Sequence, residues 1–163
     1  MAPRAAAKAA ARAAAKKENG RIVVGVDGSE PSLKALRWAV RQSGLTGDTV
    51  EAVISWEYPA AGWASMVPSM PEDFDPEKLA AKILDESLEG TLTKEEAAAV
   101  TRTVTVGSPA QILLERAEGA SLLVVGDRGY SLFTSALLGS VGLHVTQHAP
   151  CPVVVVRGAI PAA

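Results

Sequence analysis

Residues 122–157, LLVVGDRGYSLFTSALLGSVGLHVTQHAPCPVVVVR, decide the fold of this chain. The segment begins with a short apolar run, Leu122–Val125, and closes with a β-branched run, Val153–Val156. Short, continuous apolar runs bounded by glycine or proline are typical of parallel strands that are buried on both faces. The segment therefore predicts two strands of a parallel sheet, joined by a glycine-containing loop and a helix.

The glycines between these two strands have a distinctive spacing. Gly126 and Gly129 follow the first strand directly, and Gly139 with Ser140 begins the helix nine residues later. Glycine lets the backbone approach a ligand closely, and the first turn of a helix presents unpaired N–H groups to anions. We interpret this loop and helix start as a cradle for the phosphates of a nucleotide.

The remainder of the chain alternates between strand and helix patterns. Apolar runs predict three further strands at residues 22–26, 49–56 and 100–106. N-cap and proline pairs predict helices that begin near residues 29, 75 and 108. We expect Gly44 to end the first of these helices, and Leu79 to face the core from the second.

Strict alternation of strands and helices requires right-handed crossovers and a parallel sheet that is covered on both faces. The predicted fold class is therefore α/β, a single-domain, open five-stranded parallel sheet that is doubly wound (Rossmann-like), with strand order 3-2-1-4-5. In such sheets ligands bind at the carboxyl ends of the strands, where the strand order reverses. Asp27 and Gly126 follow the first and fourth strands and should lie at that point.

The composition of the chain limits the number of domains and the class of protein. A chain of 163 residues with 48% hydrophobic residues is long enough for one domain and short for two. Its single cysteine, Cys151, excludes an internal disulfide and is typical of a reducing compartment. The sequence contains neither an apolar run of about 20 residues nor a signal-peptide pattern, so we expect a cytoplasmic protein.

Charge divides the chain into dissimilar parts. Residues 1–19 carry a net charge of +4, and the remaining residues carry −6. We predict a flexible Ala/Lys/Arg-rich arm at 1–20, a ligand-binding domain at 21–158 and a tail at 159–163. The arm is either a solvated extension or a weak contact for nucleic acid. Residues 57–74 contain prolines, methionines and tryptophan without a clear period, which predicts a long surface loop.

The glycine spacing resembles that of the universal stress protein family, whose nucleotide-binding members carry G-2x-G-9x-G-[S/T]. The segments GDRG, YSLFTSALL and GS match this motif without gaps. The resemblance runs from about Arg21 to Arg157 and includes VGVDGS after the first strand and HAPCPVVVVR at the end. It implies the adenine nucleotide α-hydrolase-like variant of the doubly wound fold, and it does not include the arm.

The resemblance also implies a ligand and a set of site residues. The ligand would be ATP, with Mg²⁺ as a possible companion. Phosphates and ribose would be held by the glycine loop and the helix start, the base would lie between two valines near the end of the second strand, and an aspartate would contact the nucleotide or its metal. By position these residues are Val26, Asp27, Ser55, Val125, Gly126, Arg128, Gly129, Gly139, Ser140 and Val141.

One residue of the loop departs from the family pattern. Asp127 stands where a small polar residue is usual, and a carboxylate about 5 Å from a phosphate would cost about 3 kcal/mol at an effective dielectric of about 20. Three alternatives follow from this charge: Asp127 points away, Arg128 offsets it, or affinity is reduced. No catalytic residue is predicted, because the nucleophile-elbow pattern is absent around Ser140. No protein metal site is predicted, because no carboxylate or cysteine stands at metal-ligand spacing with His144 and His148.

Four functions remain open. The first is an ATP-binding regulator of the stress response, and its variant is a binder of cAMP or another adenine nucleotide. The others are a slow ATP hydrolase and an interaction module that needs no nucleotide. The chain has no Walker A lysine, so binding without rapid turnover is favoured. An uncovered Val153–Val156 edge strand also predicts a homodimer that pairs there, as in the family.

Overall fold

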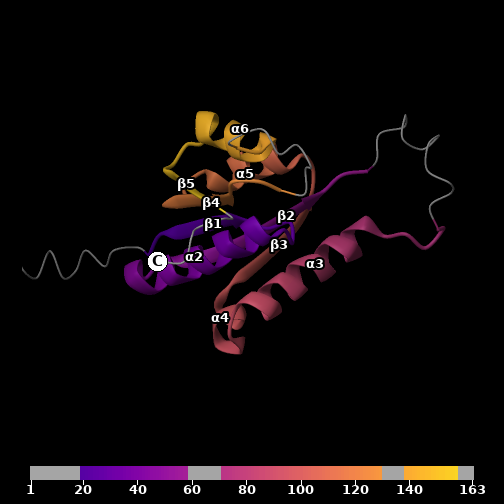
Figure 1. Cartoon of the computed structure of the whole chain (residues 1–163), viewed down its shortest axis with the longest axis horizontal. Helices are drawn as coiled ribbons and strands as arrows, with labels where there is room; N and C mark the ends of the chain where they lie inside the picture. Colours follow the sequence, from indigo (N-terminus) through magenta and orange to yellow (C-terminus); the bar gives the residue numbers. More distant parts are fainter. Residues whose placement is uncertain (1–18, 59–70, 130–137, 158–163) are drawn as a thin grey trace, which may run out of the picture.

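The computed structural model describes residues 19–58, 71–129 and 138–157. Within them the elements follow one another as strands and helices in alternation, with one additional short helix (Figure 1). They are β1 (Arg21–Gly25), α2 (Glu30–Thr46), β2 (Thr49–Trp56), α3 (Pro76–Thr91), α4 (Lys94–Ala99), β3 (Thr101–Val106), α5 (Pro109–Ala117), β4 (Leu122–Gly126), α6 (Ser140–His148) and β5 (Val153–Val156).

The strands form one parallel sheet with the order β3-β2-β1-β4-β5, which confirms the predicted fold class. Figure 1 shows α2 and α3 on one face of this sheet and α5 and α6 on the other. The strand order reverses between β1 and β4, which pair directly through Ile22–Leu122 and its neighbours. The carboxyl ends of these two strands therefore flank the expected ligand crevice.

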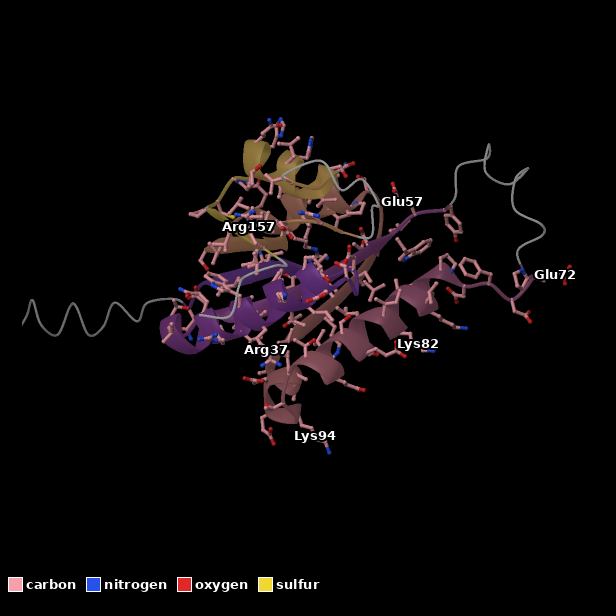
Figure 2. The ribbon with its side chains drawn as sticks, in the orientation of Figure 1. Arg37, Glu57, Glu72, Lys82, Lys94 and Arg157 are labelled. Carbon is pink, nitrogen blue, oxygen red and sulfur yellow. The ribbon has the colours of Figure 1, made fainter. Side chains whose placement is uncertain are left out.

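Each face of the sheet has its own apolar cluster. Alternate residues of β2 divide between them: Val50 and Ala52 pack with α2 and α3, and Val53 packs with α5. This is the period of two that a strand buried on both faces requires. Figure 2 shows the charged side chains of Lys82 and Lys94 pointing away from the ribbon.

Two predictions about helix α2 and helix α3 are wrong. Helix α2 continues past Gly44 to Thr46, because the left-handed conformation that ends it falls at Gly47 (φ 80°), whose N–H donates to Ser43 O. Leu79 is 46% exposed, because the core face of α3 is one residue further on, beginning with Ala80.

Helix α4 was not predicted, although its start has a recognisable signal. Thr93 and Glu96 form a capping box, in which each side chain bonds the backbone N–H of the other residue. The pattern S/T-x-x-E marks such helix starts. The helix has only six residues, too few for an apolar period to reveal it.

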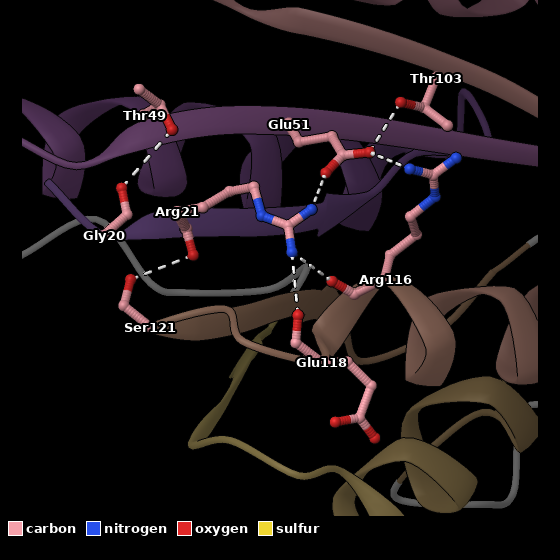
Figure 3. A network of polar contacts seen from close by, with 8 residues as sticks. All are labelled: Gly20, Arg21, Thr49, Glu51, Thr103, Arg116, Glu118 and Ser121. Atoms are coloured by element: carbon pink, nitrogen blue, oxygen red, sulfur yellow. Dashed lines mark hydrogen bonds and ion pairs between the residues drawn. The ribbon is translucent and has the colours of Figure 1, made fainter. Parts of the chain in front are cut away.

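At the amino ends of the strands, a buried carboxylate joins β1, β2, β3 and α5 (Figure 3). The Glu51 side chain is 6% exposed and forms ion pairs with Arg21 (2.5 Å) and Arg116 (3.4 Å). The Thr103 hydroxyl donates to the same carboxylate at 2.7 Å. Arg21 also donates to the carbonyls of Arg116 and Glu118 at 3.0 Å, so it caps the carboxyl end of α5.

Candidate functional site

A cavity of about 260 Å³ lies at the carboxyl ends of β1, β2 and β4, at the point where the strand order reverses. Its volume is near the lower end of the roughly 300–1,000 Å³ found for small-molecule pockets. All ten residues that the sequence analysis selected line this one cavity: Val26, Asp27, Ser55, Val125, Gly126, Arg128, Gly129, Gly139, Ser140 and Val141. The structure therefore brings together residues from positions 26 to 141 of the chain.

Gly126 allows β4 to end against the first turn of α2. A Cβ placed on Gly126 would lie 2.7 Å from the carbonyl carbon of Pro31 and 2.8 Å from its Cβ. Contacts under 3 Å with backbone atoms cannot be relieved by rotating a side chain. Only glycine fits between the two segments, and the crevice owes its shape to that close approach.

Asp27 faces the glycine loop from the end of β1. Its Oδ1 accepts hydrogen bonds from the backbone N–H of Ser29 at 2.9 Å and from the Ser29 hydroxyl. Its Oδ2 lies next to Gly129, because a Cβ placed on Gly129 would be only 2.7 Å from this oxygen. The carboxylate is thus fixed through one oxygen, while the other oxygen borders the loop.

Helix α6 presents the N–H groups of its first turn to the cavity. Gly139 is the N-cap and has no side chain to accept hydrogen bonds from them. The Gly139 N–H itself donates to Asp127 O at 2.7 Å, which fixes the loop to the helix start. Ser140 and Val141 follow in the helix and line the cavity. An oxyanion is the chemical group that such a helix start accommodates best.

The opposite wall of the cavity is apolar. Val26, directly after β1, and Val125 of β4 are both 4% exposed and line the cavity. Val26 packs in the apolar cluster of α2 and α3, whereas Val125 packs with Leu113 in the cluster of α5 and α6. Ser55 lies at the end of β2. An apolar wall opposite a polar rim can bind a ligand with a flat, hydrophobic part and a charged part.

Asp127 lies in the cavity wall and is 6% exposed. Its N–H donates to Val156 O at 2.9 Å, so the residue extends the pairing between β4 and β5. Its neighbour Arg128 is exposed at the rim. Asp127 is therefore a buried residue of the cavity lining, with a cation adjacent to it in the chain.

Several lining residues were not in the predicted set, namely Gly25, Ser32, Val53, Ile54, Pro109, Leu113, Asp127 and Gly142. Ser32 supports the end of β1, because its hydroxyl accepts from Asp27 N–H at 3.3 Å. Pro109 and Leu113 come from the start of α5, which follows β3. In a parallel sheet, the helices that follow the strands all begin at the same edge of the sheet. Applied to β3, this rule would have predicted that residues of α5 line the cavity.

A metal centre of several ligands and a helix that could span a membrane are both absent from the described residues. No group of three or more metal-ligating side chains occurs in the ranges 19–58, 71–129 and 138–157. Nor does any helix among the described residues have the length and hydropathy to cross a membrane. Burial, with a smaller contribution from the negative charge of Glu118, raises the pKa of the Cys151 thiol, which lies away from the cavity lining.

A doubly wound parallel sheet with a glycine-rich cavity at its reversal point defines a class of α/β proteins that bind ligands at that position. The model of the universal stress protein family matches residues 18–157, and the chain belongs to this family.

Individual relatives agree with the family model. Over 142 residues the chain is 33% identical to the universal stress protein Rv2623 of Mycobacterium tuberculosis, covering 83% of this chain and 44% of the relative. The chain therefore spans about half the length of the curated relatives it matches.

Solved structures of the same family superpose on this fold. A universal stress protein in complex with cAMP is 26% identical, with a TM-score of 0.54 over 86% of this chain and 98% of the other. The universal stress protein of Archaeoglobus fulgidus in complex with dAMP is 25% identical, with a TM-score of 0.58 over 84% of this chain and 97% of the other.

Proposed function

We propose that this protein binds ATP in the cavity between β1 and β4 and acts as a nucleotide-dependent regulator of the stress response. The observation that carries the proposal is the convergence of the glycine loop, the uncapped start of α6 and Asp27 on one cavity. Structural neighbours crystallised with cAMP and dAMP support an adenine nucleotide as the ligand class.

In this proposal the phosphates lie against Gly129, Ser140 and Val141, and the adenine lies against Val26 and Val125. Hydrogen bonds to a charged phosphate contribute about 1.5–3 kcal/mol each. Four such bonds, together with burial of the base, are opposed by an association cost of about 4–15 kcal/mol. We expect affinity in the micromolar range, which corresponds to about −8 kcal/mol.

Asp27 would serve the ligand through Oδ2, either at a ribose hydroxyl or at a magnesium ion carried by the phosphates. Carboxylate oxygen is a preferred ligand of Mg²⁺, which usually keeps several waters and bridges protein to phosphate. Mg²⁺ held between Asp27 and the phosphates would therefore strengthen binding of ATP more than binding of a ligand with a single phosphate charge.

The test is calorimetric titration of the purified chain with ATP, with and without Mg²⁺, and with cAMP. Micromolar binding of ATP that improves with Mg²⁺ supports the proposal. Tighter binding of cAMP than of ATP would identify a cyclic nucleotide as the ligand instead. This is the second candidate, and the structural neighbour in complex with cAMP favours it. Failure to bind any adenine nucleotide at millimolar concentration would overturn both and would favour an interaction module independent of nucleotide.

A slow ATP hydrolase is distinguished from a binder by product formation. The cavity offers Asp27 and Arg128 as the charged groups that could orient water or stabilise a leaving phosphate. Asp27→Ala should then abolish product formation and retain binding. The absence of ADP after prolonged incubation of ATP with the wild-type chain would leave binding alone as the function.

We also propose that the protein is a homodimer that pairs through β5. The strand stands at the edge of the sheet, and Val153, Val154 and Val155 are only half-buried. An apolar edge strand is a template for pairing with a second chain. Light scattering at tens of micromolar protein should give the mass of two chains, and a monomer at that concentration would contradict the proposal.

A further inference from the structure

Two buried serines at the start of helix α2 hold Asp27 in place. Its Oδ1 accepts hydrogen bonds from both the backbone N–H and the hydroxyl of Ser29. The Ser32 hydroxyl accepts from the Asp27 N–H at 3.3 Å and donates to Ser29 O at 2.9 Å. Ser29 is 7% exposed and Ser32 is 4% exposed, so these bonds are largely shielded from water. The backbone and the carboxylate of Asp27 are therefore both fixed by one short segment.

The Ser29 hydroxyl makes two bonds with different consequences. Ser29 is the N-cap of α2, and its hydroxyl oxygen accepts from the Ser32 N–H at 3.4 Å. The hydroxyl has a single proton, and it donates this proton to Asp27 Oδ1. Asp27 lines the cavity, whereas Ser29 is not among the lining residues. An effect of this hydroxyl on a bound ligand must therefore pass through Asp27 or through α2.

The bonds to Oδ1 select one orientation of the Asp27 carboxylate. Rotation about the last torsion of an aspartate is broad, so a free carboxylate would adopt many orientations. Because two donors hold Oδ1, the oxygen left beside Gly129 is Oδ2. A group that is already oriented before a ligand arrives loses less conformational entropy on binding. Resting on the function proposed above, we propose that Ser29 is a positioning residue, whose hydroxyl directs Asp27 Oδ2 toward the nucleotide.

The test is calorimetric titration of the full chain and of two Ser29 variants with ATP and Mg²⁺. Ser29→Gly removes the hydroxyl but keeps the N–H bond to Asp27, and glycine is nearly as good an N-cap as serine. It should weaken ATP binding about tenfold, the lower end of the range for losing a group that orients a ligating side chain. Ser29→Thr keeps a hydroxyl at this position and should bind ATP as tightly as the wild type.

A matched control removes a capping hydroxyl that has no connection to Asp27. Thr93 is the N-cap of α4, its hydroxyl accepts from the Glu96 N–H at 3.2 Å, and it lies outside the cavity lining. Thr93→Gly should leave the affinity for ATP unchanged. If it weakens binding as much as Ser29→Gly does, the loss comes from a weakened helix start and the proposal is overturned.

A double-variant cycle shows whether Ser29 acts through the carboxylate. In the Asp27→Ala background, Ser29→Gly should cause no further loss of affinity, because the carboxylate that the hydroxyl orients is gone. The same tenfold loss with and without Asp27 would overturn the proposal. Wild-type affinity in Ser29→Gly would overturn it too, while ATP binding itself would stand. Failure of the wild-type chain to bind any adenine nucleotide would instead overturn the proposed function, and this role of Ser29 with it.

Discussion

The carboxyl and amino ends of the strands differ in how their polar groups are bonded. At the carboxyl ends of the strands, glycines and the start of α6 line a cavity, and the N-cap of α6 makes no side-chain hydrogen bond there. At the amino ends, Glu51 is enclosed by Arg21, Arg116 and Thr103, and its carboxylate is engaged by all three (Figure 3). The polar side chains at the amino ends of the strands bond to one another and stabilise the fold. The residues at the carboxyl ends line a cavity instead.

The largest expected effect is at Gly126, where the cavity end depends on the absence of a side chain. Gly126→Val places atoms under 3 Å from the backbone of Pro31. The free energy of unfolding should fall by about 3 kcal/mol, the upper part of the usual range for overpacking. Nucleotide binding should disappear with it. Urea denaturation measures the first effect and calorimetry the second.

The matched control is Gly90→Ala, at a helical glycine where an added Cβ meets nothing within 4 Å. It should stabilise the protein by about 0.5–1 kcal/mol, because alanine is a better helix former than glycine. Equal effects of the two substitutions would show that close packing at Gly126 does not shape the cavity.

The next largest loss of stability is expected at the amino end of the sheet, at Glu51. Glu51→Ala removes a buried carboxylate that accepts hydrogen bonds from Arg21 and Thr103 and forms an ion pair with Arg116. The free energy of unfolding should fall by about 2 kcal/mol, within the range for hydrogen bonds to charged groups. Nucleotide affinity should be unchanged, because Glu51 lies at the other end of the strands. Thermal and chemical denaturation measure the loss.

A surface pair serves as the reference for Glu51. Glu86→Ala removes the partner of Lys82 in an exposed i,i+4 pair with a separation of 3.7 Å. Its cost should stay near 0.3–0.5 kcal/mol, the usual range for exposed helical pairs. If Glu51→Ala costs no more than Glu86→Ala, then the network at the amino ends does not stabilise the fold.

A smaller effect on stability, with a specific effect on binding, is expected at Gly129. The Cβ of Gly129→Ala would lie 2.7 Å from Asp27 Oδ2, which can move because it ends a side chain. The fold should therefore be kept, with a change of under about 1 kcal/mol. Displacement of the carboxylate should weaken ATP binding about tenfold, or about 1.4 kcal/mol. Unchanged affinity measured by calorimetry would exclude Asp27 from the ligand contacts.

The smallest effect concerns Cys151, two residues before the start of β5. Burial, and after it the charge of Glu118, raises the pKa of its thiol above the ordinary value. Because the folded pKa is the higher one, the associated stability is present below the unfolded value of about 8.5 and is lost as pH rises through the folded pKa. Alkylation near pH 8 should be slower in the folded chain than in urea. Equal rates would contradict the raised pKa.

Much of the cavity end was predictable because its requirements are local. Gly126 and Gly129 come directly after an apolar strand and Gly139 begins a helix, so each can be recognised from its neighbours in the sequence. Their role as contacts for ATP stays a prediction, as do the domain limits at residues 20 and 158. The segment 59–70 of the predicted 57–74 loop is outside the described residues.

The amino end was not predictable in the same way. Glu51 interrupts an apolar strand, but its partners are at positions 21, 103 and 116, and no local pattern connects them. Similarly, two glycines three residues apart could each have ended α2, and the choice of Gly47 over Gly44 depended on which one adopts the left-handed conformation.

The sequence by itself determined the alternation of strands and helices and the glycines at the reversal point, because hydrophobic periodicity and glycine spacing are local properties. The full set of ten site residues was implied by the resemblance to the universal stress protein family. Tertiary structure alone decided three features: the orientation of Asp27 toward Gly129, the burial of Asp127 in the cavity wall and the enclosure of Glu51. Each depends on distances between segments far apart in the chain, and these are set only when both faces of the sheet are packed.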